Sequence, residues 1–230
     1  MFANFDFDVI YRSLSYVLLE GLRLTLILTA LATLGGLVLG TLLALMRLSS
    51  NKVLSWISAT YVNVFRSLPL LLVIFWFYFL VPYIGQWVTG SSRPMQVGAF
   101  YSALITFILF EAAYFAEIMR AGIQSISKGQ VSAGYAIGLR YSQVMRYVVL
   151  PQALRNMSPV LLTQTIILFQ DTSLVYVLSV TDLLGAASKI AQRDFRIVEM
   201  YLFAALVYFV ISFAASQLVR ALRKRIAIVR

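Results

Sequence analysis

Few side chains in this sequence could do covalent chemistry, and the missing types are informative. None of the 230 residues is histidine or cysteine. Proton transfer by imidazole and nucleophilic attack by a thiolate are therefore excluded. A phosphate-binding Gly-x-x-x-x-Gly-Lys-[Ser/Thr] loop needs a lysine after a glycine, and no glycine here is followed by lysine. We therefore predict no catalytic residue, metal or cofactor on this chain.

Polar and ionisable side chains within long apolar stretches are the candidates for function. Such groups are costly at bilayer depth and usually face the interior of a helix bundle. Arg66 could bind a substrate carboxylate, because a planar guanidinium forms paired hydrogen bonds with it. The alternative is an internal salt bridge from Arg66 to Asp171 or Glu111. The candidate pathway residues are Asn63, Arg66, Ser67, Pro69, Glu111, Gln164, Asp171 and Thr172.

The other candidates also have structural interpretations. Asp171 and Thr172 could stabilise a broken helix end rather than contact a substrate or partner at the outer mouth. Gln164 could line the path or hydrogen-bond across helices. Glu117 lies three residues before Arg120, a spacing that predicts a surface ion pair.

The composition predicts that these groups face a membrane interior. The chain is 61% hydrophobic and 12% charged, whereas soluble domains are about 45–50% apolar and about 25% charged. This excludes a water-soluble globular enzyme, a disordered chain and a disulfide scaffold. A net charge of +10 would suit nucleic-acid binding in a soluble protein, but membrane topology explains most of it, so we predict no nucleic-acid partner.

Long uncharged stretches predict an all-α polytopic membrane protein with five transmembrane helices. A crossing helix needs about 20 apolar residues, and 23 uncharged residues separate Arg23 from Arg47. Twelve lysines and arginines fall in one set of connecting segments and six in the other. The positive-inside rule therefore predicts an N-out, C-in orientation. The expected spans are 22–46, 56–83, 97–119, 157–180 and 199–219.

The segments outside the spans complete the predicted organisation. Residues 1–20 form an N-terminal periplasmic segment with a short interfacial helix at 9–20, and their acidic start argues against a cleaved signal peptide. The transmembrane domain covers 21–219. Residues 181–196 form a polar helix that touches a partner or caps the bundle. The basic tail 220–230 anchors the inner face and attracts anionic lipid.

The cytoplasmic loop 120–156 is long and has the pattern of folded structure. Ser127 and Gln130 have the spacing of a capping box, and Gly138 suits the left-handed residue that ends a helix. They predict a helix over 128–138, followed by a second over 142–150 that Pro151 breaks or bends. The small residues 132–134 would let another protein approach closely. The alternative is an amphipathic helix lying on lipid headgroups.

This loop resembles that of binding-protein-dependent ABC importer permeases. In that family the loop contains Glu-Ala-Ala, a glycine a few residues later, and a hydrophobic-Leu-Pro ending. Residues 132–134 (Ser-Ala-Gly), Gly138 and 149–151 (Val-Leu-Pro) occupy these positions, whereas the literal Glu-Ala-Ala at 111–113 lies in the third span. The resemblance implies that the ATPase-coupling residues are Gly129, Gln130, Ser132, Ala133, Gly134, Gly138 and Pro151.

Other segments extend the resemblance over nearly the whole chain. Residues 111–126 are similar to the polar-amino-acid subfamily, and residues 63–70 and 169–178 look most like glutamate/aspartate permease subunits. The resemblance implies a type I ABC importer permease fold. It also implies a translocation subunit, not an enzyme, that couples ATPase motion to alternating access, with glutamate or aspartate as substrate.

The resemblance also implies partners and a location. These are a second permease chain, a cytoplasmic ATPase dimer that binds ATP and Mg, and a periplasmic amino-acid-binding protein, assembled in the bacterial inner membrane. One alternative is a stand-alone secondary transporter or channel, which would be expected to show inverted repeats. A second alternative is a membrane scaffold without a transport role. No repeat is visible, and five spans do not divide into equal halves.

Overall fold

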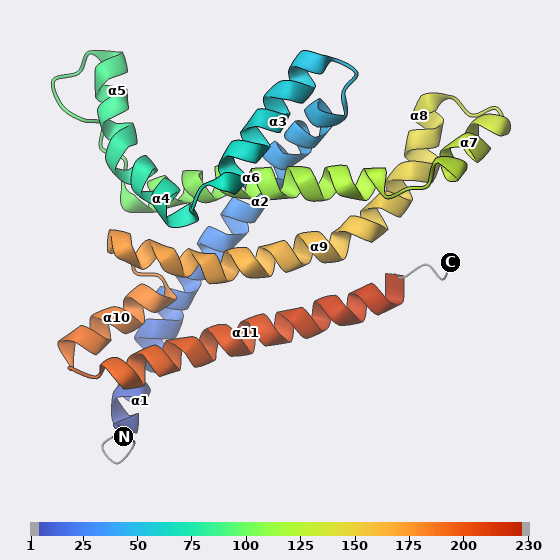
Figure 1. The fold of residues 1–230 in the computed structure, drawn as a ribbon. Coiled ribbons are helices and arrows are strands. Elements are labelled where there is room, and N and C mark those ends of the chain that lie inside the picture. Colours follow the sequence, from blue (N-terminus) through green and yellow to red (C-terminus); the bar gives the residue numbers. More distant parts are fainter. Residues whose placement is uncertain (1–4, 227–230) are drawn as a thin grey trace. The chain divides into compact units, whose positions relative to one another are not determined.

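The described part of the chain, residues 5–226 of a computed structural model, is built from helices (Figure 1). No strand occurs in this range, which confirms the predicted all-α fold. Residues 1–4 and 227–230, the ends of the predicted N-terminal segment and basic tail, lie outside the described residues. The α-helices are α1 (Phe7–Tyr16), α2 (Arg23–Leu48), α3 (Lys52–Ser67), α4 (Leu70–Phe75), α5 (Val81–Thr89), α6 (Ala99–Gln124), α7 (Lys128–Ala136), α8 (Tyr141–Val144), α9 (Leu150–Asp171), α10 (Leu183–Arg193) and α11 (Ile197–Ile226).

The described residues contain five helical stretches long and apolar enough to cross a membrane, as predicted. The fifth contains the expected span 199–219, and the third begins two residues after the start of the expected span 97–119. The other three differ from the sequence prediction at their boundaries. The five stretches are Phe7–Leu48, Leu70–Thr89, Ala99–Gln124, Tyr141–Leu178 and Ile197–Ile226.

The first stretch is one continuous helical path, so the helix expected at 9–20 is joined directly to the first span, and its interfacial position stays a prediction. It begins after Asp6, whose carboxylate accepts hydrogen bonds from the backbone N–H groups of Asp8 and Val9. Such a cap satisfies donors that a helix start leaves unpaired. A π-helical segment, Val17–Leu22, then joins α1 directly to α2.

The second predicted span, 56–83, is wrong, because the helix stops in its middle. α3 ends at Ser67, and α4 begins at Leu70. Proline has no N–H group and disfavours helical backbone at the preceding residue. Pro69 has extended backbone, and its carbonyl accepts the N–H of Val73 at 3.2 Å. The apolar stretch therefore begins after this break and continues through a π-helical segment, Trp76–Leu80, into α5.

Of the two predicted effects of Pro151, a break or a bend, the break is wrong. The chain stays helical from α8 through a π-helical segment, Met145–Val149, into α9. In this wider turn the N–H of Leu150 bonds to the carbonyl of Met145. Pro151 follows directly after this π-helical turn, where the regular hydrogen-bond pattern is already interrupted and a missing N–H costs less. The helix that contains the fourth predicted span therefore begins before residue 157.

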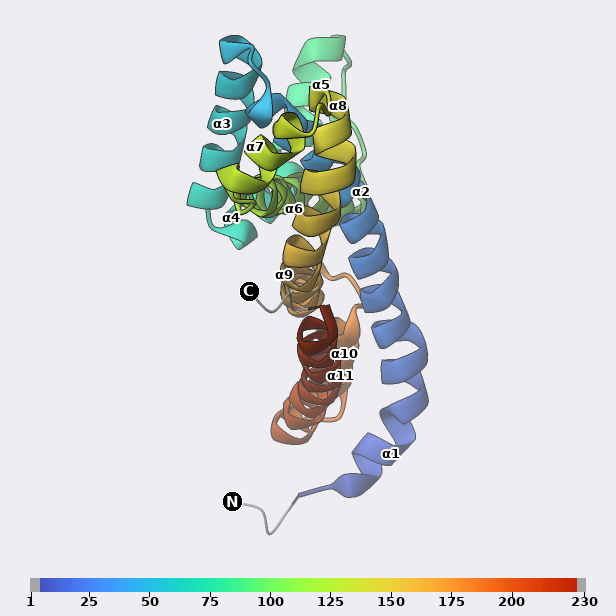
Figure 2. The same cartoon turned by 90° about the vertical axis from the view of Figure 1, so that its right-hand side faces the viewer.

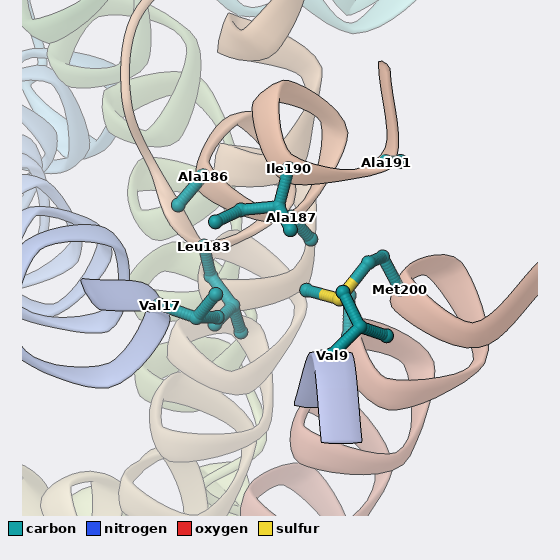
Figure 3. Close-up of a cluster of buried hydrophobic side chains, with 9 residues drawn as sticks. Val9, Val17, Leu183, Ala186, Ala187, Ile190, Ala191 and Met200 are labelled. Carbon is teal, nitrogen blue, oxygen red and sulfur yellow. The ribbon is translucent and has the colours of Figure 1, made fainter. Parts of the chain in front are cut away.

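The chain divides into two compact units, each with its own packed side chains. The first comprises Met1–Leu34, Leu68–Ile108 and Ile166–Ala215, and the second comprises Gly35–Ser67, Leu109–Thr165 and Ser216–Arg230. In the first, one cluster joins α1, α10 and the start of α11; Figure 3 shows its side chains converging. In the second, α7 and α8 lie side by side in both ribbon views (Figures 1 and 2).

Candidate translocation and coupling sites

Arg66 lies in the last turn of α3, within the second unit. A cation is favourable there because the carbonyl end of a helix carries partial negative charge. Its Cζ atom lies 5.4 Å from the ring centroid of Tyr114 on α6, a cation–π contact. This contact uses the guanidinium face, whereas carboxylate recognition uses its edge. With 16 residues, α3 is shorter than the five helical stretches that are long and apolar enough to cross a membrane, and the depth of Arg66 in the bilayer stays a prediction.

Two other predicted pathway residues, Asn63 and Ser67, share this end of α3. Both are exposed, and the Ser67 hydroxyl donates to the Asn63 carbonyl at 2.7 Å. Pro69 follows at the helix break. No pattern in the sequence points to Tyr114, because nothing there links it to a residue on another helix.

Glu111 and Gln164 meet across α6 and α9 in the second unit. Glu111 is buried, with 2% of its surface exposed, and its Oε1 accepts a hydrogen bond from Gln164 Nε2 at 3.2 Å. The predicted cross-helix role of Gln164 is therefore confirmed. Gly36 lets α2 approach α6 closely beside Glu111, since a Cβ on Gly36 would lie 3.0 Å from the Glu111 Cβ.

Asp171 and Thr172 belong to the first unit, at the end of α9. Regular α-helix stops at Asp171, and a 3₁₀ segment continues from Thr172 to Leu178. The buried Thr172 hydroxyl donates to the Phe169 carbonyl at 2.7 Å. The geometry supports the structural interpretation of a changed helix end. The expected surface pair of Glu117 and Arg120 is confirmed, with 2.9 Å between Glu117 Oε2 and Arg120 Nε.

The loop helix α7 begins at the predicted residue, Lys128, and ends at Ala136, two residues before the predicted end. Its start differs in detail: the N–H of Gln130 bonds to the Ser127 backbone carbonyl at 3.0 Å, and the Ser127 side chain caps nothing, so the capping box is wrong. At its end Gly138 has φ +84°, and the N–H of Leu139 bonds to the Gly134 carbonyl at 3.1 Å. This left-handed closure is the predicted one.

The three small residues of α7 face different surroundings. Ser132 and Ala133 are exposed, but Gly134 is buried. A Cβ on Gly134 would lie 3.0 Å from Val144 Cγ2, so its small size serves contact within this chain. We had predicted that all three admit a partner, and this is wrong for Gly134.

The outward surface of the loop combines polar and apolar groups. Among the predicted coupling residues, Gly129, Gln130 and Pro151 are exposed. Tyr135 is 47% exposed and Ile137 77% exposed, which the sequence analysis had not singled out. These two side chains could meet either a protein partner or the lipid headgroups.

The corresponding helix of the first unit, α10, starts at a buried carboxylate. Asp182 accepts hydrogen bonds from the N–H groups of Leu184 and Gly185 at 3.1 and 2.9 Å, and from the Tyr208 hydroxyl at 3.3 Å. Burial raises the pKa of Asp182 from 3.8 to about 6, although the hydrogen bonds oppose this. α10 therefore completes the packing of its unit. Of the two roles predicted for residues 181–196, this contact fits capping of the bundle.

The fold defines a multi-pass helical membrane protein with an exposed loop helix, α7. Residues 36–228 match the family described as binding-protein-dependent transport system inner membrane component, and the chain belongs to this family. Its members are membrane translocation components that work with a separate ATPase and a binding protein. The predictions of a permease subunit rather than an enzyme, and of an inner-membrane location, are confirmed.

Similar proteins cover nearly the full length of the chain. The glutamate/aspartate import permease protein GltK of Escherichia coli is 54% identical, over 97% of this chain and 99% of that protein. The glutamine transport system permease protein GlnP of E. coli is 32% identical, over 98% and 99%. A crystal structure of an amino acid ABC transporter with histidines has a TM-score of 0.86 at 32% identity, covering 96% of this chain and 98% of that one.

Proposed function

We propose that this chain is the permease subunit of an ATP-driven importer for glutamate and aspartate. The observation that carries the proposal is the 54% identity to GltK over 97% of the chain. The exposed Arg66 at the end of α3 is consistent with a substrate that carries carboxylates. Family membership argues against a stand-alone secondary transporter or channel and against a scaffold.

The proposed assembly contains four kinds of component. A second permease chain would lie beside this one in the membrane. This chain would have the N-out, C-in orientation. ATP and Mg would bind to a cytoplasmic ATPase dimer, with no cofactor on this chain. A periplasmic amino-acid-binding protein would deliver the substrate. Alternating access would be a transition between two conformations. ATP and the loaded binding protein would favour different conformations, as any ligand-driven transition requires.

Coupling would pass through α7 into the helices on either side of it. Beneath α7, Ile126, Val144, Val149 and Ala153 form a buried cluster to which Val131 of α7 contributes. Close-packed side chains transmit displacement with little compression. A push on the exposed surface of α7 would therefore move the end of α6 and the start of α9 together.

Arg66 would attract a carboxylate of the passing amino acid. Tyr114 holds one face of the guanidinium and leaves its hydrogen-bonding edge to be used by the substrate. Glu111 is already occupied by Gln164 and would keep α6 and α9 in register. Asn63 and Ser67 present polar groups on the same turn, and Asp171 with Thr172 would act at the end of α9.

The test is uptake into vesicles that contain the purified complex with its ATPase and binding protein. We expect ATP-dependent uptake of labelled glutamate and aspartate in preference to glutamine and arginine. Uptake without ATP would contradict the proposed class. Preferred uptake of arginine would contradict the substrate but leave the class intact.

The role of Arg66 is tested by Arg66→Ala and Arg66→Lys, with the exposed Arg93→Ala as a control of equal charge change. We expect Arg66→Ala to reduce uptake about tenfold or more at unchanged membrane abundance, because a charge-assisted pair contributes about 1.5–3 kcal/mol. Arg66→Lys should restore part of the uptake. Equal losses of uptake and abundance would instead indicate a structural role.

A further inference from the structure

The second unit contains a cavity of about 680 Å³ that the transport mechanism does not use. It lies among the end of α6, the first half of α9 and the end of α11. Three arginines line it, one from α9 and two from α11. We call this cavity the basic pocket, and its polar lining includes Arg155, Asn156, Thr163, Ser216, Arg220 and Arg223.

The charge of the basic pocket is not balanced by its own walls. Its lining contains no aspartate or glutamate. Among the described residues, the ion pairs do not include Arg155, Arg220 or Arg223. Three guanidinium groups gathered at one cavity favour an anion, and phosphate is well matched to their geometry.

The position of the basic pocket along α11 indicates which anions could reach it. The uncharged stretch 200–219 has 20 residues, about the length that crosses the hydrocarbon core. Arg220 is the first charge after this stretch, so it should lie at headgroup level. Val160 and Val219 supply an apolar wall beside the arginines, as a molecule with a charged head and an apolar body would need.

A surface hollow along α11 extends the basic surface next to the pocket. It has a volume of about 650 Å³, shares Arg220 and Arg223 with the basic pocket, and adds Lys224. A tail that attracted lipid only through diffuse charge would not require Arg155 from another helix.

We propose that the basic pocket binds the phosphate headgroup of an anionic phospholipid. Arg155 and Arg223 approach the phosphate from two helices, so the bound lipid ties the start of α9 to the end of α11. The shared chemistry, an anion held by arginines, would also fit inorganic phosphate or a free amino-acid carboxylate, and the experiment separates these sources.

The experiment is native mass spectrometry of the detergent-solubilised complex titrated with phosphatidylglycerol or phosphatidylcholine. We expect the wild-type chain to retain phosphatidylglycerol in preference. The double variant Arg155→Gln/Arg223→Gln should weaken that binding about 25-fold, at about fivefold for each arginine facing an anionic headgroup. The matched control Arg146→Gln/Arg225→Gln removes the same charge outside the basic pocket and the surface hollow and should change binding by less than about twofold.

Three results would overturn the proposal. They are equal retention of both lipids, equal loss in both double variants, and displacement of the lipid by millimolar inorganic phosphate or glutamate. Unchanged helical circular dichroism and elution volume of each variant complex show that folding is intact. Because the readout is lipid retention, its failure is independent of any failure in the uptake assay.

Discussion

Two short helices outside the long apolar stretches, α7 and α10, serve opposite purposes. Seven of the 11 residues of α10 are buried within its unit, whereas of the nine residues of α7 only Gly134 is buried. The sequence allowed α10 either to touch a partner or to cap the bundle, and it allowed α7 either to dock a partner or to lie on lipid headgroups. Burial separates them: α10 completes a core, and α7 presents a surface.

The difference has a chemical cause that can be seen along each helix. In α10, Leu183, Ala187 and Ile190 recur at helical spacing and face the cluster of Figure 3. In α7 the residues are small or polar, and Val131 is the large aliphatic side chain that reaches the neighbouring cluster. A helix with so narrow an apolar stripe leaves most of its circumference exposed.

The strongest test of this comparison is Gly185→Ala in α10. A Cβ at this position would lie 2.2 Å from the Val180 carbonyl oxygen, so the backbone itself must shift. We expect a loss of about 3 kcal/mol or more, the upper range for overpacking. Thermal unfolding of the purified complex and membrane abundance measure it. A wild-type melting temperature would mean that α10 does not pack as described.

Asp182, the buried N-cap of α10, predicts a pH-dependent change in stability nearly as large as the loss expected for Gly185→Ala. Because its folded pKa is raised from 3.8 to about 6, Asp182 contributes stability below about pH 4 that is lost as the pH rises through about 6. Two pKa units correspond to roughly 3 kcal/mol. Asp182→Asn keeps a good cap and should flatten the melting temperature between pH 4 and 6.

The control for this pH effect is Asp194→Asn. Arg193 lowers the pKa of the partly exposed Asp194, so this variant should keep the wild-type trend between pH 4 and 6. If the melting temperature of Asp182→Asn still fell between pH 4 and 6, another group would be responsible for the trend.

Ala133→Trp tests the surface role of α7. Ala133 is exposed, so a large side chain should leave the melting temperature unchanged yet obstruct a docked ATPase. A central interface residue contributes about 2 kcal/mol, which predicts roughly 30-fold weaker ATPase association and a matching loss of uptake. Co-purification measures it, with Ala30→Trp on the exposed side of α2 as control. Normal association would remove α7 from the interface.

The smallest effect is expected from Gly129→Ala in α7. A Cβ at Gly129 would meet only the Ser127 side chain, at 3.9 Å, and alanine favours the helix by up to about 1 kcal/mol. The melting temperature should stay constant or rise slightly. A large fall would show that α7 packs as tightly as α10, which would end the contrast between them.

The elements were largely predictable, and their junctions were not. The number of spans, the α7 helix and its Gly138 closure follow from local patterns of apolar residues and glycine. The break at Pro69 and the continuation through Pro151 show the limit of such patterns. Both prolines lack the N–H group, but only near Pro151 does a π-helical turn rearrange the hydrogen bonds so that the helix continues.

Composition and motif alone established that this chain is a multi-pass permease with a structured loop, because hydrophobic length and the loop pattern are properties of contiguous residues. Tertiary structure alone decided which small residues pack inward, since Gly134 meets Val144 only once the loop has folded. It also decided that Arg66 faces Tyr114 and that Arg155 joins Arg220 and Arg223. These contacts join residues far apart in the chain, and packing between helices, unlike helix formation, leaves no periodic signal in a single sequence.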